Sequence, residues 1–292
     1  MKRRYALAGW GTLLVGATLL VAVPARPQDA LLVVAHGSRS PEWNERVVDL
    51  VSQVRWGGPV GVAFLMQAPP ERALDQVAVQ LDQTGVDRII VVPLLVSSFS
   101  GHYEEIRYYV GQREDAPGHV NYAPLKTQAE LVLTSGMDDH PLISQILLDQ
   151  IKHLSTESAN ETVVLVAHGP NEEEDNQRWV ERLTRHGERI REALRLRRVE
   201  VMTLRDDAPK PVRNAATEQL RGTIERAAAA GRVLVVPVLI SVGYLQRQIH
   251  ERLEGLDYVM SERGLSDHPL AAEWIRQQAL QPSAALAMQR PE

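Results

Sequence analysis

The chain has 292 residues, a formal charge of −5, 44% hydrophobic residues and no cysteine. Its length suits two domains of ordinary size, and the apolar fraction is sufficient for packed cores. The absence of cysteine excludes disulfide bonds and thiolate metal sites, so a bound metal would need His, Asp or Glu ligands. An acidic chain without a basic cluster is a poor nucleic-acid binder, and no nucleic-acid partner is expected.

The first 25 residues have the pattern of a secretory signal peptide. Lys2-Arg3-Arg4 is followed by an uncharged stretch at 5–23 and by small residues at Val23-Pro24-Ala25. Cleavage after Ala25 would remove three basic residues and change the formal charge from −5 to −8. We therefore expect export to the periplasm with no stable membrane association. The alternative is an uncleaved membrane anchor.

Residues 26–155 are expected to form an N-terminal domain in which strands and helices alternate. Short continuous apolar runs predict buried strands, and apolar residues at helical spacing predict the helices between them. The expected strands are 31–35, 59–66, 88–96 and 119–124, and the expected helices are 41–54, 71–84, 102–112, 128–136 and 141–155. This alternation predicts a parallel sheet with right-handed crossovers.

The second half is expected to repeat this order after a polar linker at 156–161. The expected C-terminal domain covers 162–282, and residues 283–292 are expected to form a weakly ordered tail. Its expected strands are 162–167, 199–204, 233–240 and 257–260, and its helices are 171–196, 211–230 and one after Gly243.

Three short motifs occur once in each half, in the same order. They are Val-Ala-His-Gly at 34–37 and 166–169, Val-Val-Pro-x-Leu at 91–95 and 235–239, and Asp-His-Pro-Leu at 139–142 and 267–270. Matching order and spacing indicate a duplicated α/β unit. In the last motif, Asp139 and Asp267 are expected to cap the helices that follow.

Two histidines are expected to converge at one edge of the first sheet. His36 directly follows the first strand, and His102 follows the third strand at the start of a helix. The carboxyl ends of neighbouring parallel strands lie at the same sheet edge, which is where ligands bind in open α/β sheets. Two neutral imidazoles there can hold a divalent first-row metal. Glu104 or Glu105 could add a third ligand or a proton acceptor.

These motifs resemble those of the class II tetrapyrrole chelatases, the CbiX/SirB-like sirohydrochlorin cobaltochelatases and ferrochelatases. The matching residues are Val34-Ala35-His36-Gly37-Ser38-Arg39, Ala63-Phe64-Leu65 before Pro69-Pro70, and Val92-Pro93-Leu94-Leu95 leading to Gly101-His102. The resemblance implies two tandem flavodoxin-like domains with the tetrapyrrole in the cleft between them. It also implies that His36 and His102 bind the metal and accept pyrrole protons.

Further candidate site residues lie close to the two histidines in the sequence. Glu105 is expected to assist catalysis, and Ser38, Arg39, Ser98 and Gly101 are expected to bind the substrate through hydroxyls, backbone N–H groups and a guanidinium. The metal, Co²⁺, Fe²⁺ or Ni²⁺, would be a substrate, and no nucleotide is expected. A homodimer is compatible with the sequence.

The chain departs from the family at two positions. Met66 stands where family members often carry an acidic residue, and Tyr244 stands in the second half where the first has His102. His168 is therefore expected to have lost its partner and to be a relic, although Tyr244 or His250 could lie nearby.

The leading interpretation is a lyase that inserts metal into a sirohydrochlorin-type tetrapyrrole, with its working site in the first half. The alternative is an exported metal-binding or tetrapyrrole-binding protein that has lost turnover. A histidine phosphatase fits poorly, because that chemistry needs an arginine before His-Gly and Ala35 stands there.

Overall fold

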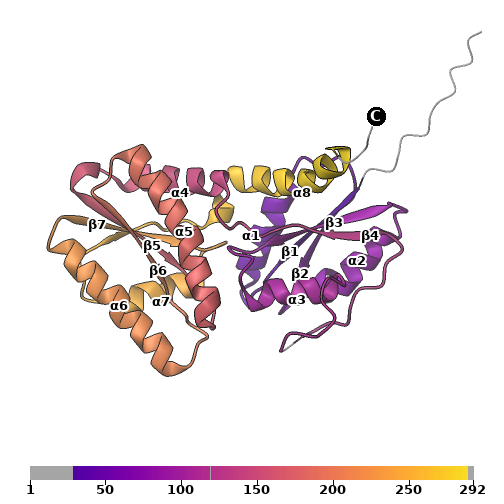
Figure 1. Ribbon diagram of the computed structural model, residues 1–292, viewed down its shortest axis with the longest axis horizontal. Helices are drawn as coiled ribbons and strands as arrows, with labels where there is room; N and C mark the ends of the chain where they lie inside the picture. Colours follow the sequence, from indigo (N-terminus) through magenta and orange to yellow (C-terminus); the bar gives the residue numbers. More distant parts are fainter. Residues whose placement is uncertain (1–28, 119, 289–292) are drawn as a thin grey trace, which may run out of the picture.

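The computed structural model of the chain describes residues 29–118 and 120–288. The predicted signal peptide at 1–25 and His119 lie outside these residues. The described residues form two four-stranded parallel sheets, with strand orders β2-β1-β3-β4 and β6-β5-β7-β8. The two sheets lie side by side, each flanked by helices on its faces (Figure 1).

The first sheet and its helices follow the expected order over most of their length. The elements are β1 (Ala30–Ala35), α1 (Pro41–Ser52), β2 (Val60–Phe64), the 3-10 turn η1 (Pro70–Arg72), α2 (Leu74–Asp82), β3 (Arg88–Leu94), α3 (Gly101–Tyr109), β4 (Glu130–Leu133) and α4 (Pro141–Leu154). The apolar strand β1 is fully buried because it lies between β2 and β3.

The second sheet repeats this arrangement. Its elements are η2 (Ser158–Asn160), β5 (Glu161–Ala167), α5 (Glu173–Leu194), β6 (Arg198–Thr203), α6 (Lys210–Ala228), β7 (Arg232–Val238), α7 (Tyr244–Arg252), β8 (Val259–Met260), η3 (Leu265–Asp267) and α8 (Leu270–Met288). The strand β5 occupies the central place that β1 has in the first sheet.

The structure contradicts two of the elements predicted for the first half, the strand at 119–124 and the helix at 128–136. Residues 120–124 form a loop, which side chains hold in place: Asn121 donates to Leu65 O and Tyr122 donates to Phe64 O. The segment expected to be a helix at 128–136 contains β4, which pairs with β3. Periodicity could not separate these cases, because a short continuous apolar run suits a buried strand and a buried helix equally.

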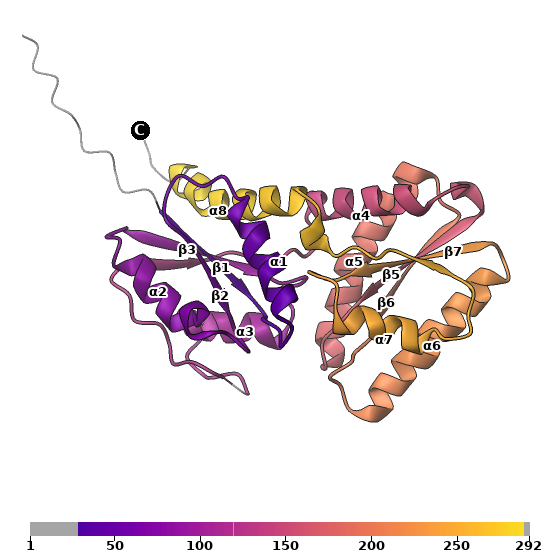
Figure 2. The ribbon, with the colours of Figure 1, turned by 180° about the vertical axis from the view of Figure 1, so that it is seen from behind.

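The last helix of each half packs against the other half. Helix α4 packs against α5 and β7, whereas α8 packs against β3 and α1. Figures 1 and 2 show α4 on the side of the second sheet and α8 on the side of the first. One apolar cluster consequently joins residues of both halves, and the exchange was not expected from the repeat.

The predicted linker and tail are both structured in part. The linker contains η2 and ends at Glu161, whose buried carboxylate accepts hydrogen bonds from Ser155 and from the backbone N–H of Thr156. Helix α8 extends to Met288, past the expected start of the tail at residue 283.

Candidate functional site

His36 lies at the carboxyl end of the central strand, in a turn that fixes its backbone. Its carbonyl accepts a hydrogen bond of 2.9 Å from Met66 N, and Gly37 follows with a φ of 86°. A Cβ at Gly37 would lie 2.0 Å from Met66 O, so only glycine fits. The His36 Nδ1 lies 2.6 Å from Gly37 O. Because a carbonyl only accepts, Nδ1 carries the hydrogen and Nε2 keeps its lone pair.

His102 faces His36 from the first turn of α3. This helix is capped by Ser100, whose hydroxyl accepts from Tyr103 N. The two imidazole centroids are 4.5 Å apart, with the ring planes at 74°. The predicted convergence of the two histidines is therefore present in the structure.

Glu105 orients the His102 ring. Its Oε1 lies 3.2 Å from His102 Nδ1, one helical turn away, and its side chain is largely buried. A carboxylate on Nδ1 fixes the tautomer with the lone pair on Nε2, as is common for metal-binding histidines. Within the described residues, neither His36 Nε2 nor His102 Nε2 has a hydrogen-bond partner.

The environment of His36 keeps its ring neutral. Burial and the nearby His102 lower the pKa of His36 from 6.5 to about 4. A neutral imidazole is the form that binds metal, whereas an imidazolium does not. His36 is thus prepared to bind a cation without first losing a proton at neutral pH.

Glu104 is turned away from the pair. Its carboxylate bonds to Arg107 at 3.0 Å and to Arg113 at 2.7 Å. Partial burial acts to raise the pKa of Glu104, but these two arginines keep it below the usual value. Of the two glutamates considered from the sequence, Glu105 is the one placed at the histidines.

The predicted substrate-binding residues lie in the two segments that carry the histidines, and they differ in how many hydrogen bonds they already make. Ser98 already donates to Asp138 and accepts from Gly136 N, so its hydroxyl holds the loop before α3. Ser38 bonds to Asn44 through its backbone N–H and carbonyl. Gly101 opens α3 with no atom within 4 Å of an added Cβ, and Arg39 is exposed. As substrate ligands, these four residues remain predictions.

The second half brings its own histidine to the same region. The carboxyl edges of the two sheets face each other. Trp179 of α5, which follows β5, donates to Phe99 O in the turn after β3, and a Cβ at Gly243, after β7, would lie 3.7 Å from Trp43 of α1. His168 Nε2 lies 3.2 Å from Asp207 Oδ2. The second histidine is absent, as expected, and His168 pairs instead with an aspartate from the turn after β6, a partner that was not predicted.

Of the two residues considered for that role, Tyr244 lies near Asp206, the neighbour of Asp207, whereas His250 has other partners. Tyr244 is 57% exposed, and His250 bonds to Tyr258 and Glu262. The available sequence signal for Asp207 was its position just after β6, where the sheet edge collects polar groups.

Contacts from α5 hold the loop before His102 in place. Trp179 Nε1 donates to Phe99 O at 2.5 Å, and the guanidinium groups of Arg178 and Arg182 lie 5.4 and 5.5 Å from the centre of the Phe99 ring. These cation–π contacts join the two halves beside the site.

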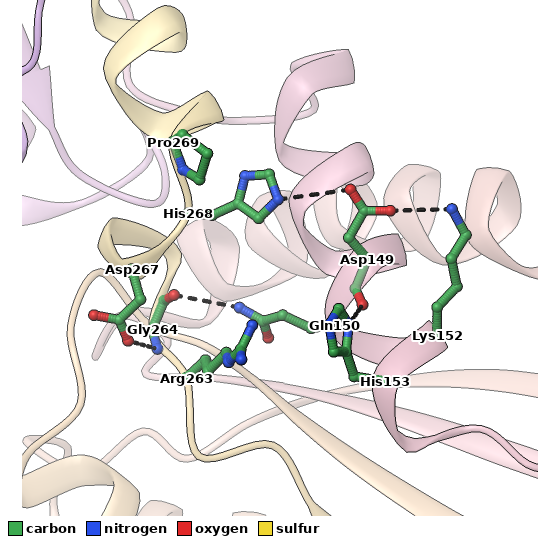
Figure 3. Close-up of a pocket in the computed structure, with 9 residues that line it drawn as sticks. All are labelled: Asp149, Gln150, Lys152, His153, Arg263, Gly264, Asp267, His268 and Pro269. Atoms are coloured by element: carbon green, nitrogen blue, oxygen red, sulfur yellow. Dashed lines mark hydrogen bonds and ion pairs between the residues drawn. The ribbon is translucent and has the colours of Figure 1, made fainter.

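A separate cavity of about 300 Å³ lies between α4 and the segment before α8 (Figure 3). Three of its charged or titratable side chains interact: Asp149 contacts Lys152 at 3.0 Å and His268 at 3.6 Å. None of the predicted site residues lines this cavity. His268 Nδ1 also accepts from Leu270 N, as His140 Nδ1 accepts from Leu142 N, so these histidines are the helix caps and the expectation for Asp139 and Asp267 is wrong.

The described residues contain neither a larger cluster of metal-ligating side chains nor a helix that could cross a membrane. Among residues 29–118 and 120–288, no group of three or more His, Asp or Glu side chains has the spacing of a metal site. The His36–His102 pair offers a cation two imidazole ligands. The described helices include none with the length and apolar character needed to cross a membrane.

The sequence model of the CbiX family matches residues 30–154. This match shows that the N-terminal half of the chain is similar to the CbiX family. The sirohydrochlorin cobaltochelatase of Methanothermobacter thermautotrophicus is similar to it, with 26% identity over 136 residues, 44% of this chain and 93% of the relative. The enzyme of the same name from Methanopyrus kandleri is 25% identical over 137 residues, 42% of this chain and 94% of the relative.

Solved structures extend the likeness to both halves. SirB from Bacillus subtilis with Fe³⁺ covers 90% of this chain and 98% of its own, with a TM-score of 0.67 and 18% identity. A chelatase-like multi-domain protein from Deinococcus radiodurans covers 87% of this chain and 55% of its own, with a TM-score of 0.55 and 20% identity. The predicted class II chelatase relationship and the tandem α/β fold are both confirmed.

Proposed function

We propose that this protein is a lyase that inserts a divalent first-row metal into a sirohydrochlorin-type tetrapyrrole, in the cleft between its two halves. The observation that carries the proposal is the His36–His102 pair, with 4.5 Å between ring centroids and each Nδ1 already engaged. The sirohydrochlorin cobaltochelatases similar to this chain support the reaction and the substrate class.

The residues suit the steps that metal insertion requires. The two Nε2 lone pairs hold the incoming cation, and Glu105 offsets its charge through His102. Few protein ligands leave positions open for the pyrrole nitrogens to replace the water around the metal. As the metal enters the macrocycle, two pyrrole N–H bonds break and the two protons pass to bases in the cleft or to water.

The metal is a substrate in this proposal, with Co²⁺, Fe²⁺ and Ni²⁺ as candidates because imidazole ligands suit all three. No nucleotide takes part. The two facing sheet edges come from one chain, so a homodimer is compatible with the site but is not required to complete it.

The direct test measures metal insertion into sirohydrochlorin by protein that lacks residues 1–25. The wild type is expected to produce a metal-dependent change in the absorption spectrum of sirohydrochlorin. The rate of this change should fall at least about 10²-fold in His36→Ala and in His102→Ala. The exposed His153, which lies outside the site, provides the matched control, and His153→Ala should keep the wild-type rate. Equal rates in all four proteins would refute the assignment.

The alternative is a carrier that binds metal or tetrapyrrole without turnover. Met66, in place of an acidic residue beside the first-half site, favours it. Stoichiometric Co²⁺ binding that is lost in His102→Ala, with no insertion by the wild type, would select the carrier over the enzyme.

We also propose that the protein is exported, on the basis of the sequence of residues 1–25. Cell fractionation should recover it in the periplasm, and replacing Arg3 and Arg4 by glutamine should leave it in the cytoplasm. Equal distribution of the two forms would contradict export through this segment.

A further inference from the structure

We propose that the second half supplies a working base to the site: Asp207, held by His168, stands across the cleft from His36 and His102 and accepts a proton from the substrate. The inference rests on the proposed function and adds a catalytic residue from the half whose site was expected to be degenerate.

The turn after β6 directs one of two neighbouring aspartates toward the cleft. Asp206 is 8% exposed and forms an ion pair with Arg252. The Asp207 side chain is 69% exposed and bonds only to His168 among the described residues. Asp206 therefore holds the turn against α7, whereas Asp207 remains available to a ligand.

The turn itself is tied to His168. Arg205 N donates to His168 O at 2.7 Å, and Arg205 has a φ of 50°, which is uncommon for a residue other than glycine. The Arg205 side chain is buried and bonds to Glu173 and to Pro170 O, next to the His168 turn. These contacts hold Asp207 at a fixed place relative to His168.

The same turn in the first half has no carboxylate. Met66 N donates to His36 O just as Arg205 N donates to His168 O, so Met66 corresponds to Arg205 and Ala68 to Asp207. Residues 66–69 are Met-Gln-Ala-Pro, whereas the equivalent turn in the second half contains both aspartates. The acidic group that the first-half turn lacks is thus present on the facing sheet edge.

The carboxylate of Asp207 interacts electrostatically with His36 and His102. The hydrogen bond from His168 lowers the pKa of Asp207, and the nearby His36 and His102 act in the same direction. At neutral pH the carboxylate is ionised, whereas His36 is neutral. The site therefore presents the neutral ring of His36 beside His102 on one side and one negative charge on the other.

Asp207 can take up one of the pyrrole protons released when the metal is inserted. A pyrrole N–H bond breaks, its electron pair stays on the nitrogen and forms the bond to the metal, and the proton passes to Asp207 Oδ1. The other oxygen, Oδ2, keeps its bond to His168 Nε2. The proton then leaves to water when the metallated product departs, which restores the carboxylate.

The test compares Asp207→Asn with Glu225→Gln in the full chain. Glu225 is an exposed carboxylate on α6 and serves as the matched control. The single-turnover rate of insertion should be about 10²-fold lower in Asp207→Asn. In steady-state measurements, the KM for the tetrapyrrole should be unchanged within about twofold. Asp207→Glu should recover most of the rate. A rate for Asp207→Asn within about twofold of the control would overturn the proposal.

A double variant tests whether the two residues act as one unit. If His168 works by holding Asp207, His168→Gln should slow insertion, and the double variant with Asp207→Asn should be no slower than Asp207→Asn alone. If the double variant were slower by the product of the two single effects on the rate, His168 and Asp207 would act independently, and the proposed pair would be contradicted.

Metal titration separates failure of this inference from failure of the proposed function. If the wild type inserts no metal, the proposed function fails, but Co²⁺ binding to the His36–His102 pair still reports the influence of Asp207. Loss of its unit charge should weaken Co²⁺ binding about threefold, whereas Glu225→Gln should not. Equal Co²⁺ affinities would contradict the placement of Asp207 across the cleft.

Discussion

At the scale of single residues, the function depends on how each histidine ring is held. Glu105 fixes His102 and is largely buried, whereas Glu104, one residue earlier, is paired with two arginines. Neighbouring residues of the same chemistry thus have different roles, and comparing them isolates the role of the carboxylate at the ring.

We predict that Glu105→Gln weakens Co²⁺ binding about 10-fold to 100-fold, because His102 loses the charged partner that orients it. Glu104→Gln should bind Co²⁺ as the wild type does. Isothermal titration of both variants measures the difference, and equal weakening in both would contradict a specific role for Glu105.

A second residue-scale prediction concerns acid stability. Burial lowers the pKa of His36 and of His186 from 6.5 to about 4. His186 is fully buried between Ser144 and Asp138 O. Between pH 6.5 and 4 the unfolded chain binds more protons than the folded chain, so stability is lost as the pH falls through this window.

Urea unfolding at pH 7 and at pH 4.5 tests this linkage. The wild type should lose about 2 kcal/mol from His186 alone, with a smaller part from the less buried His36. His186→Gln should be less stable at pH 7 but should depend less on pH. An unchanged pH dependence in that variant would show that His186 does not carry the effect.

At the scale of elements, the strands and the first turn of α3 were predictable and the exchange of helices was not. Continuous apolar runs such as 31–35 identify buried strands, and a histidine after such a run lies at a ligand-binding edge. Nothing in the local pattern of α4 or α8 says which sheet the helix covers, because an apolar face is complementary to either core. Asp207 was missed for a related reason: its partner His168 is 39 residues away and belongs to another strand.

The exchanged helix α8 is expected to contribute strongly to stability through Trp274. This residue is completely buried, and its Nε1 has no hydrogen-bond partner among the described residues. Trp274→Ala should cost about 3–5 kcal/mol of unfolding free energy, whereas Trp274→Phe should cost less because it removes an unpaired N–H along with some volume.

Chemical denaturation of these variants measures that contribution. Leu280, on the same helix and 41% exposed, provides the control, and Leu280→Ala should change stability by less than about 0.5 kcal/mol. Similar losses at both positions would indicate that α8 is not packed as described.

At the scale of the whole molecule, the two halves share one apolar cluster and present facing sheet edges. Each half contributes a helix to the core of the other, and each contributes a strand-end histidine to the facing edges. The tandem domains and the fold class were predictable from the three motifs that occur in both halves. The facing of the edges depends on tertiary packing, which the repeat does not specify.

We predict that a fragment of residues 26–155 does not fold cooperatively, because it lacks α8 and exposes the apolar face of α4. Co-expression with residues 156–292 should restore a complex with one unfolding transition. Circular dichroism during heating tests both, and a sharp transition of the fragment alone would show that the exchanged helices are dispensable.

The central claim is that the Nε2 atoms of His36 and His102 hold the metal together. X-ray absorption at the cobalt edge, on protein loaded with one Co²⁺, tests this claim most directly. We predict scattering from two imidazole rings at about 2.0–2.2 Å, falling to one ring in His102→Ala. A spectrum with no imidazole, or one unchanged in His102→Ala, would contradict the account.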